Sequence, residues 1–259
     1  MLNTNTSFKL ITRDIERSLD RVERDPAVKR EAEYYLKNIS KVKSVKDFLA
    51  DDRLFRFAMK AHGLSNMTYA KAFMKKALEE GIDSSQSFAN KLADTRYRDF
   101  VETFNFARHG ETATIFTRAQ AGTVDRYMRQ VLEENAGRDN EGVRLALYFQ
   151  RKAPEIDNFY EVLADPALSR VVRTALSLPD SFASADIDKQ VAFFEQKLDI
   201  ADFKDAKKLD KFLERFTSLW ELGNPSAGAP SSAAATLIGR PAEFGVSGSL
   251  LLQIQSMRR

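Results

Sequence analysis

Apolar residues recur every three or four positions along most of this chain, and that period constrains the fold more than any other feature. Near the N-terminus the recurring apolar residues are Phe8, Ile11, Ile15, Leu19 and Val22. This spacing places apolar side chains along one face of an α-helix, and charged residues fill the opposite face. The stripe predicts one amphipathic helix over residues 1–24, which the Asp25-Pro26 pair ends.

Similar stripes continue to about residue 222, and no stretch alternates apolar and polar residues between turn signals, as a surface strand does. Before residue 223 there are four prolines. Pro26, Pro154 and Pro166 fit the first position of a helix, and Pro179 fits a turn. The sequence therefore predicts an all-α fold.

One short segment occurs twice. Residues 49–51 read Leu-Ala-Asp, and so do residues 163–165, which lie 114 positions further on. At the same offset the identities continue at Leu54 and Leu168, Arg56 and Arg170, Ala61 and Ala175, and Leu64 and Leu178. We predict an internal duplication: two related multi-helix units, packed together. Chance alignment of helical periods is the alternative, and whether the units share one core stays open.

In each copy of this segment the three residues have distinct physical roles. The leucine is expected to be buried, the alanine allows close approach of two helices, and the aspartate caps the next helix by accepting a backbone N–H. The segment is therefore predicted to be a helix corner, and its recurrence requires no chemistry.

The helical pattern and the repeat divide the chain into four parts. These are an N-terminal helix (1–24), a first helical unit (25–110), a long connecting helix with the second unit (111–222), and a C-terminal part of different composition (223–259). The last part is rich in Pro, Gly, Ser and Ala, which is typical of a flexible linker or strap. It ends in a predicted short apolar helix. Its candidate partner-binding residues are Leu250, Leu251, Leu252, Ile254 and Met257. This segment is expected either to dock on its own domain or to fit a partner's groove.

The charges are balanced. There are 40 Lys and Arg against 37 Asp and Glu, interleaved along the chain, whereas a protein that binds polyanions concentrates positive charge on one face. With no Cys, disulfides and thiolate chemistry are excluded. No apolar run reaches the roughly 18 residues that span a bilayer, and no signal-peptide core is visible. We expect no membrane span, and either a cytoplasmic location or export through the flagellar pathway without a cleaved signal.

The sequence offers few candidates for catalysis. His62 is placed in the last turn of a helix, where its charge would favour the helix dipole. His109 lies in a break in the helical pattern, and neither histidine has a second ligand at a metal-binding spacing. The paired acids Asp51-Asp52 and Glu79-Glu80 are interpreted as a helix cap and a solvated helix end. We therefore expect no enzyme activity, cofactor or metal.

Residues 84–106, SSQSFANKLADTRYRDFVETFNF, carry a longer motif. Its elements are Ser87-Phe88, Asn90, Leu92, Asp94, Arg96-Tyr97 and Phe104-Asn105-Phe106. On these residues the chain resembles the bacterial domain-of-unknown-function family twelve-seventeen, whose genes in alphaproteobacteria tend to lie among flagellar genes. The segment around residue 50 and the apolar tail also resemble that family. The resemblance implies a flagellum-associated role and supplies no catalytic residues.

Taken together, these features predict a non-enzymatic flagellum-associated protein that acts by protein–protein contact in flagellar assembly or structure. Its partner would be a flagellar protein. The alternative is a helical regulator that binds nucleic acid through a folded basic face, built from Lys37, Lys41, Lys43, Lys46, Arg53 and Arg56. An enzyme, the third reading, would need a pocket of polar groups around His109 or Asp94. The sequence does not predict the oligomeric state.

Overall fold

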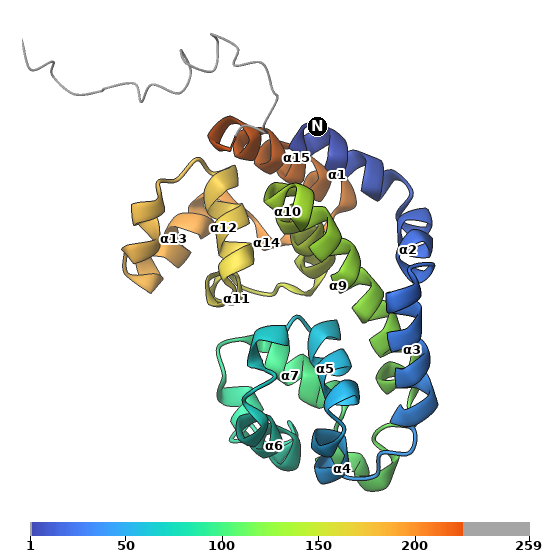
Figure 1. The fold of residues 1–259 in the computed structure, drawn as a ribbon. Coiled ribbons are helices and arrows are strands. Elements are labelled where there is room, and N and C mark those ends of the chain that lie inside the picture. Colours follow the sequence, from blue (N-terminus) through green and yellow to red (C-terminus); the bar gives the residue numbers. More distant parts are fainter. Residues whose placement is uncertain (1, 225–259) are drawn as a thin grey trace, which may run out of the picture.

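The computed structural model describes residues 2–224, and these residues form an all-α fold without a β-strand, which confirms the predicted fold class. Two helical lobes lie one above the other, and the long helix α9 (Ala121–Asp139) runs from one to the other (Figure 1). None of the helices in the described part is long and apolar enough to cross a membrane. The predicted strap and terminal helix lie outside the described residues.

The first lobe holds the elements from α3 up to α9. Its elements are α3 (Pro26–Ile39), α4 (Val45–Ala50), α5 (Asp52–Ala61), η1 (Ser65–Met67), α6 (Lys71–Glu80), η2 (Phe88–Lys91), α7 (Thr95–Thr103), α8 (Phe106–His109), η3 (Gly110–Thr112) and η4 (Thr117–Ala119). Phenyl rings fill its core: the Phe48 and Phe104 ring centroids are 4.9 Å apart, and those of Phe100 and Phe104 are 5.0 Å apart. Such ring pairs add to the stabilisation from area burial.

The second lobe holds the helices that follow α9. Its elements are α10 (Glu141–Lys152), η5 (Ala153–Glu155), α11 (Phe159–Ala164), α12 (Pro166–Ala175), η6 (Asp180–Ser184), α13 (Ile187–Lys197), α14 (Ile200–Lys204) and α15 (Ala206–Gly223). Its core is a separate cluster, in which the ring centroid of Phe203 lies 5.2 Å from those of both Phe149 and Phe212. The lobes therefore have two cores and not one.

The N-terminal region differs from its prediction, because two helices replace the single helix expected over residues 1–24. Asp14 leaves the helical conformation, with φ −142° and ψ 75°, and its side chain accepts the Arg17 N–H. It therefore ends α1 (Thr4–Arg13) and caps α2 (Ile15–Glu23). The apolar stripe continues across this break, so periodicity alone could not reveal it.

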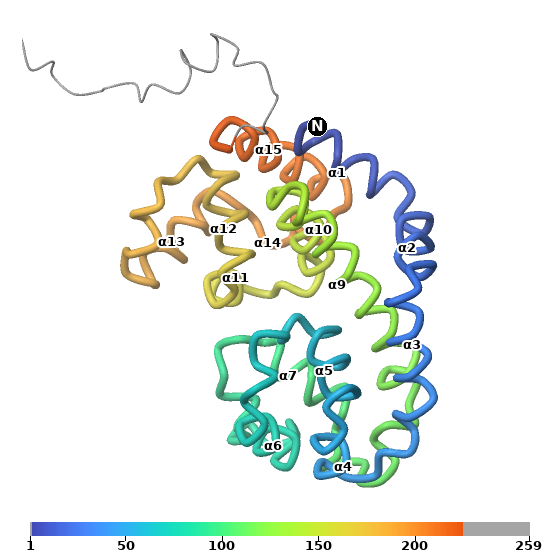
Figure 2. Tube along the Cα trace, viewed as in Figure 1, coloured from blue at the N-terminus to red at the C-terminus, as the bar shows by residue number. Residues whose placement is uncertain are grey.

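The break lets the N-terminal region contact both lobes, as the blue end of the tube in Figure 2 shows. Phe8 of α1 joins the core of the second lobe, whereas Val22 of α2 joins the core of the first. Polar bonds hold α1 on α15, since the backbone N–H of Thr4 donates to Glu221 Oε2 at 2.9 Å and Lys9 pairs with Glu214 at 2.6 Å. Helices α1 and α2 thus cross from one lobe to the other.

The two Leu-Ala-Asp segments form matching corners, 114 residues apart. Asp51 accepts the backbone N–H groups of Arg53 and Leu54, and Asp165 likewise caps α12. After each pair of helices the chain turns in the left-handed region, at Gly63 (φ 70°) and at Ser177 (φ 56°). The cap predictions are confirmed. Duplication of the complete units stays a prediction, since this match covers the corners only.

Candidate functional site

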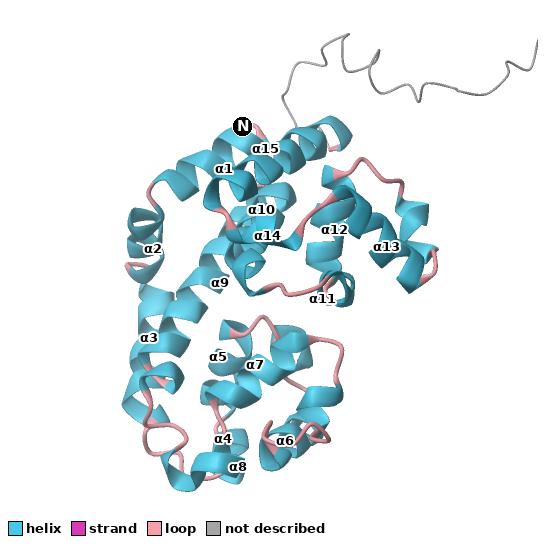
Figure 3. Cartoon of the chain, turned by 180° about the vertical axis from the view of Figure 1, so that it is seen from behind, coloured by secondary structure: helices cyan, strands magenta, loops and turns pink. Residues whose placement is uncertain are grey.

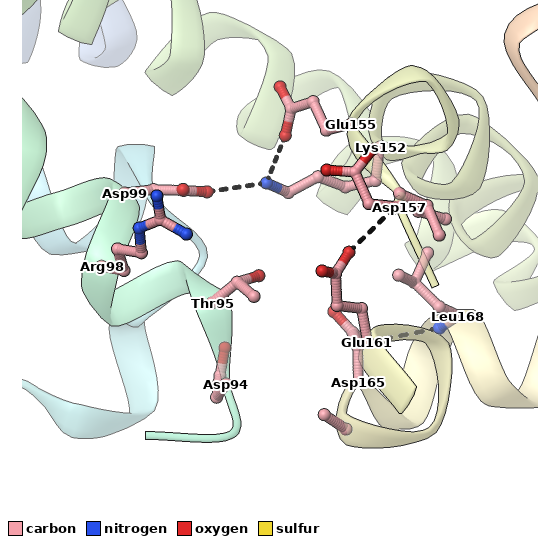
Figure 4. A pocket seen from close by; sticks show the side chains of 12 residues that line it. Asp94, Thr95, Arg98, Asp99, Lys152, Glu155, Asp157, Glu161, Asp165 and Leu168 are labelled. Atoms are coloured by element: carbon pink, nitrogen blue, oxygen red, sulfur yellow. Dashed lines mark hydrogen bonds and ion pairs between the residues drawn. The ribbon is translucent and has the colours of Figure 1, made fainter. Parts of the chain in front are cut away.

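A polar cavity of about 120 Å³ lies where α7 of the first lobe faces α11 and α12 of the second. Lys152 joins its two sides, because its Nζ lies 2.9 Å from Asp99 Oδ2 on α7 and 2.7 Å from Glu155 Oε2 (Figure 4). The Lys152 side chain is 15% exposed and that of Asp99 31%, so water screens this pair only partly. The enzyme alternative requires a pocket of polar groups near His109 or Asp94, and this cavity is the pocket near Asp94.

The carboxylates around the cavity are engaged in structural bonds. Asp94 caps α7 and holds Arg96 in a two-point pair, and Arg96 also donates to the carbonyl of Gly63 at 2.9 Å. Asp165 accepts the hydroxyl of Tyr148 and caps α12. Both carboxylates thus serve as helix caps and hold a neighbouring side chain in place.

Asp157, at the rim of the cavity, is also held in an ion pair. Its oxygen lies 2.8 Å from Lys204 Nζ, and the hydrogen bond and charge of Lys204 lower the pKa of this carboxyl below its usual value. Nowhere in residues 2–224 do three His, Asp or Glu side chains group in a way that would hold a metal ion. The Lys152–Asp99 ion pair across the cavity makes it a polar joint between the lobes.

A buried ion pair lies next to this joint, on the residue that precedes Lys152. Arg151 of α10 donates to both carboxylate oxygens of Glu133 on α9, at 2.6 and 2.9 Å, and Glu133 is 3% exposed. Two-point pairing of this kind is the geometry that offsets the cost of burying both charges. Because Glu133 lies on the helix that connects the lobes, the pair fixes α10 against α9.

The structure corrects the prediction for His62. The histidine is buried at the C-terminal end of α5, and Arg126 Nη1 lies 3.2 Å from its Nδ1. A guanidinium only donates, so the ring must be neutral with its proton on Nε2. Burial, followed by the charges of Arg126, Lys152 and Arg151, lowers the pKa of His62 well below its usual value. His62 therefore supplies no charge to the helix dipole.

The break around His109 forms an exposed loop on a rigid base. Ala113, Thr114 and Ala119 are fully buried; the Thr114 hydroxyl donates to the carbonyl of Val42, and the Tyr35 hydroxyl donates to that of Ala119 at 2.6 Å. This anchoring is why the connecting helix begins at Ala121 and not directly after the break.

Between these anchors two apolar side chains point outward. Ile115 is 54% exposed and Phe116 38% exposed. The Phe116 ring lies edge to face with His109, with centroids 4.7 Å apart, and the Arg118 guanidinium is 5.3 Å from its centroid. We call this set of four residues the loop surface. The sequence marks the break, but it does not predict a surface at Ile115 and Phe116, whose only signal is a pair of apolar residues outside any stripe.

The six basic residues of the nucleic-acid alternative do not all remain free. Lys43 pairs with Glu111 at 3.4 Å, and Arg53 pairs with Glu31 at 3.0 Å. Lys37, Lys41 and Lys46 are exposed, in a stretch from 37 to 46 that contains no acid. The predicted partner-binding residues Leu250, Leu251, Leu252, Ile254 and Met257 lie outside the described residues.

The motif of residues 84–106 has a structural role throughout. The Asn90 amide donates to the carbonyls of Ile82 and Ser84, both at 2.8 Å. Asn105 caps α8 by accepting the Arg108 N–H at 3.0 Å, and Asp94 caps α7. These polar residues hold turns and helix ends in place, so the motif contributes to the fold.

Comparison with known proteins gives one family and one solved structure. The model of a family described as a protein of unknown function, DUF1217, matches residues 61–209, which is more than half of the chain. The chain is also similar to a protein from Agrobacterium tumefaciens of known crystal structure, with 50% identity and a TM-score of 0.81, over 86% of this chain and 94% of that one. No curated protein matches. Residues 84–106 therefore indicated the family correctly, and the chain belongs to the DUF1217 family.

Proposed function

We propose that this protein is a non-enzymatic, flagellum-associated protein that acts by protein–protein contact in flagellar assembly or structure. The observation that carries the proposal is the loop surface: two adjacent apolar side chains exposed on a loop whose neighbours are fully buried. Burying apolar area on a partner contributes about 25 cal/mol per Å². A loop that is already ordered loses little conformational entropy on binding.

The residue types of the loop surface support binding to protein. Aromatic residues and arginine are enriched in the centres of protein interfaces, where a ring supplies area and a guanidinium supplies directed donors. Here Phe116 and Arg118 are held together, because Arg118 Nη2 also lies 3.0 Å from His109 Nε2. The charged groups of the joint between the lobes are already paired with one another, which leaves the loop surface as the better candidate.

The flagellar assignment rests on the family. The family's genes in alphaproteobacteria tend to lie among flagellar genes, and the similar protein of known structure comes from Agrobacterium tumefaciens. This is an argument from gene neighbourhood and relationship, and it does not depend on the loop surface. The predicted apolar tail would provide a second contact.

Fractionation of cells tests both parts of the proposal. We expect the protein in the flagellar fraction, and we expect the double variant Ile115→Asp/Phe116→Asp to be lost from it. Tyr69→Asp is the matched control, since Tyr69 is an isolated aromatic side chain, 80% exposed, in the same lobe. A wild-type protein absent from the flagellar fraction, or a double variant that stays there like the control, would refute the proposal.

Binding to nucleic acid is the second candidate, favoured by the exposed lysines at 37, 41 and 46 in a stretch without acids. Phosphate contacts make affinity fall steeply with salt. Binding to duplex DNA that weakens steeply as the salt concentration rises, and that is weaker still for the variant Lys41→Glu/Lys46→Glu, would support this second candidate. Binding that is absent at low salt would remove it.

A further inference from the structure

A second exposed apolar surface lies on the other lobe, and its charge is opposite. Tyr160 at the start of α11 is 51% exposed and Ile187 at the start of α13 is 59% exposed. The Tyr160 hydroxyl donates to Asp188 Oδ1 at 2.9 Å, which fixes the ring beside the N-terminal end of α13. We call these two side chains, with Asp186, Asp188 and Glu195, the acidic surface.

Negative charge dominates this region. Residues 180–195 contain four carboxylates and one lysine. The hydrogen bond to Asp188 and its charge raise the pKa of the Tyr160 phenol, and burial and the charges of Glu195 and Asp186 act in the same direction with smaller effects. The acidic surface therefore has two apolar side chains at its centre and carboxylates at its rim.

Positive charge surrounds the loop surface in the same way. Arg118 lies on the Phe116 ring, and the Thr114–Val42 hydrogen bond holds the loop against the stretch from 37 to 46, which has four lysines and no acid. The acids near this surface are paired: Glu111 with Lys43, and Asp83 with Arg108 beside His109. Each of the two surfaces thus has two exposed apolar side chains and a rim in which charge of one sign predominates.

The two surfaces cannot meet within one chain in this structure. The loop surface follows α8 at the far end of the first lobe, whereas α11 and α13 lie in the second lobe, with α13 at its outer edge (Figures 1 and 3). The two lobes are joined by α9 and by the ion pairs described above. A contact between unlike surfaces of two copies leaves one free surface of each kind, so it can repeat.

We infer that the loop surface of one copy binds the acidic surface of a second copy, head to tail. This inference rests on the proposed function, because both use the loop surface, and it names the partner as the chain itself. Apolar contact between Phe116 and the Tyr160–Ile187 pair supplies affinity, and the opposite rims supply orientation. With so few apolar residues the interface is small, so association is weak and depends on concentration.

Light scattering of the full chain over a range of concentrations tests the inference. We expect the average mass to rise with concentration at low salt and to fall towards the monomer at high salt, because salt screens the rims. Ile115→Glu/Phe116→Glu, and separately Ile187→Lys/Asp188→Lys, should each weaken association about tenfold or more. Tyr69→Glu should leave it unchanged.

Mixing the two variants distinguishes this geometry from a symmetric dimer. The loop variant, Ile115→Glu/Phe116→Glu, keeps an intact acidic surface. The acidic-surface variant, Ile187→Lys/Asp188→Lys, keeps an intact loop surface. An equimolar mixture should therefore form a one-to-one complex that does not extend, although each variant alone stays monomeric. A wild-type chain that is monomeric at every concentration, a loop variant that still associates, or a mixture that does not pair would each overturn the inference.

The outcomes separate this inference from the proposed function. If the wild-type chain is monomeric but the loop variant is still lost from the flagellar fraction, the loop surface binds another protein and only the self-association is wrong. If self-association holds but the protein is absent from the flagellar fraction, only the flagellar role is wrong. If the inference holds, the acidic-surface variant should also be lost from the flagellar fraction, since no copy then offers an intact acidic surface to the loop surface.

Discussion

The corner between α4 and α5 and the corner between α11 and α12 are closed by the same hydrogen bond in different surroundings. Tyr34 donates to Asp51 at 2.9 Å on the surface, with the Arg53 guanidinium 3.9 Å from its ring centroid. Tyr148 donates to Asp165 in the second corner, but it is 6% exposed and the charge of Arg96 from the other lobe acts on it. Local residues close both corners, and burial determines how much each bond stabilises the fold.

The largest difference in stability between the two corners is expected for the residues about one helical turn after Tyr34 and Tyr148. Arg151 pairs with the buried Glu133, whereas Lys37, which occupies the matching position 114 residues earlier, is exposed. Arg151→Ala leaves a buried carboxylate unpaired and should lower the free energy of unfolding by about 3–5 kcal/mol. Lys37→Ala should change it by less than about 0.5 kcal/mol. Urea unfolding measures both free-energy changes. Equal changes would show that the buried Arg151–Glu133 pair stabilises the fold no more than the exposed Lys37 does.

The next difference concerns the start of α10. An added Cβ at Gly142 would lie 2.3 Å from Trp220 Cδ1, whereas the matching position in the first lobe is Val28, which has room for its side chain. Gly142→Ala should therefore cost about 1–3 kcal/mol through overpacking. Trp220 is the single Trp of the chain, so its fluorescence should report the displaced ring. Unchanged emission and stability would contradict this close approach.

The corners should also differ in their response to acid, because His62 matches Leu176 in the second corner. The unfolded chain protonates His62 near pH 6.5, but the native state holds its pKa well below that value. The unfolded state therefore binds more protons as pH falls, and stability should drop by about 1.4 kcal/mol per unit below pH 6.5 until the native pKa is reached. His62→Leu should remove this part of the pH dependence. An identical pH profile for both proteins would refute it.

Removing the two hydroxyls compares the corners directly. Tyr148→Phe leaves Asp165 without a buried donor and should cost about 1.5 kcal/mol, whereas Tyr34→Phe at the surface should cost about 0.5 kcal/mol or less. Thermal unfolding of both variants at the same pH provides the comparison. Equal costs would mean that burial does not strengthen the bond.

The smallest effect is expected at the turns after α5 and α12. Ser177 has φ 56°, a conformation that costs an L-residue about 1 kcal/mol, and Gly63 adopts a similar one without that cost. Ser177→Gly should stabilise the protein by about 0.5–1 kcal/mol, and Gly63→Ala should destabilise it by a similar amount. At Gly63 an added Cβ would meet only atoms 3.8 Å away, so the backbone alone determines the result. Changes of the same sign at both turns would contradict this.

Several features followed from neighbouring residues alone. The period of apolar residues predicts the all-α fold, and the two Leu-Ala-Asp segments predict the helix caps at Asp51 and Asp165. These signals could be recognised because a helix and its cap are formed by residues within about four positions of one another. The family motif of residues 84–106 was recognisable for the same reason.

Other features required the tertiary structure. The break at Asp14 lies inside an unbroken apolar stripe, and it is the two cores packed against α1 and α2 that hold the broken form. Glu133 is an ordinary helix residue in the sequence, yet it is buried because Arg151 approaches from another helix. Ile115 and Phe116 are exposed because hydrogen bonds to residues far along the chain fix their neighbours.

The sequence by itself therefore determined the class of fold, the caps and corners, and the family. Only the tertiary structure decided that there are two cores, which charges are buried between the lobes, and which apolar side chains face solvent. The physical reason is the range of the interactions: periodicity and capping act within a few residues, whereas burial depends on segments that meet only after the chain has folded.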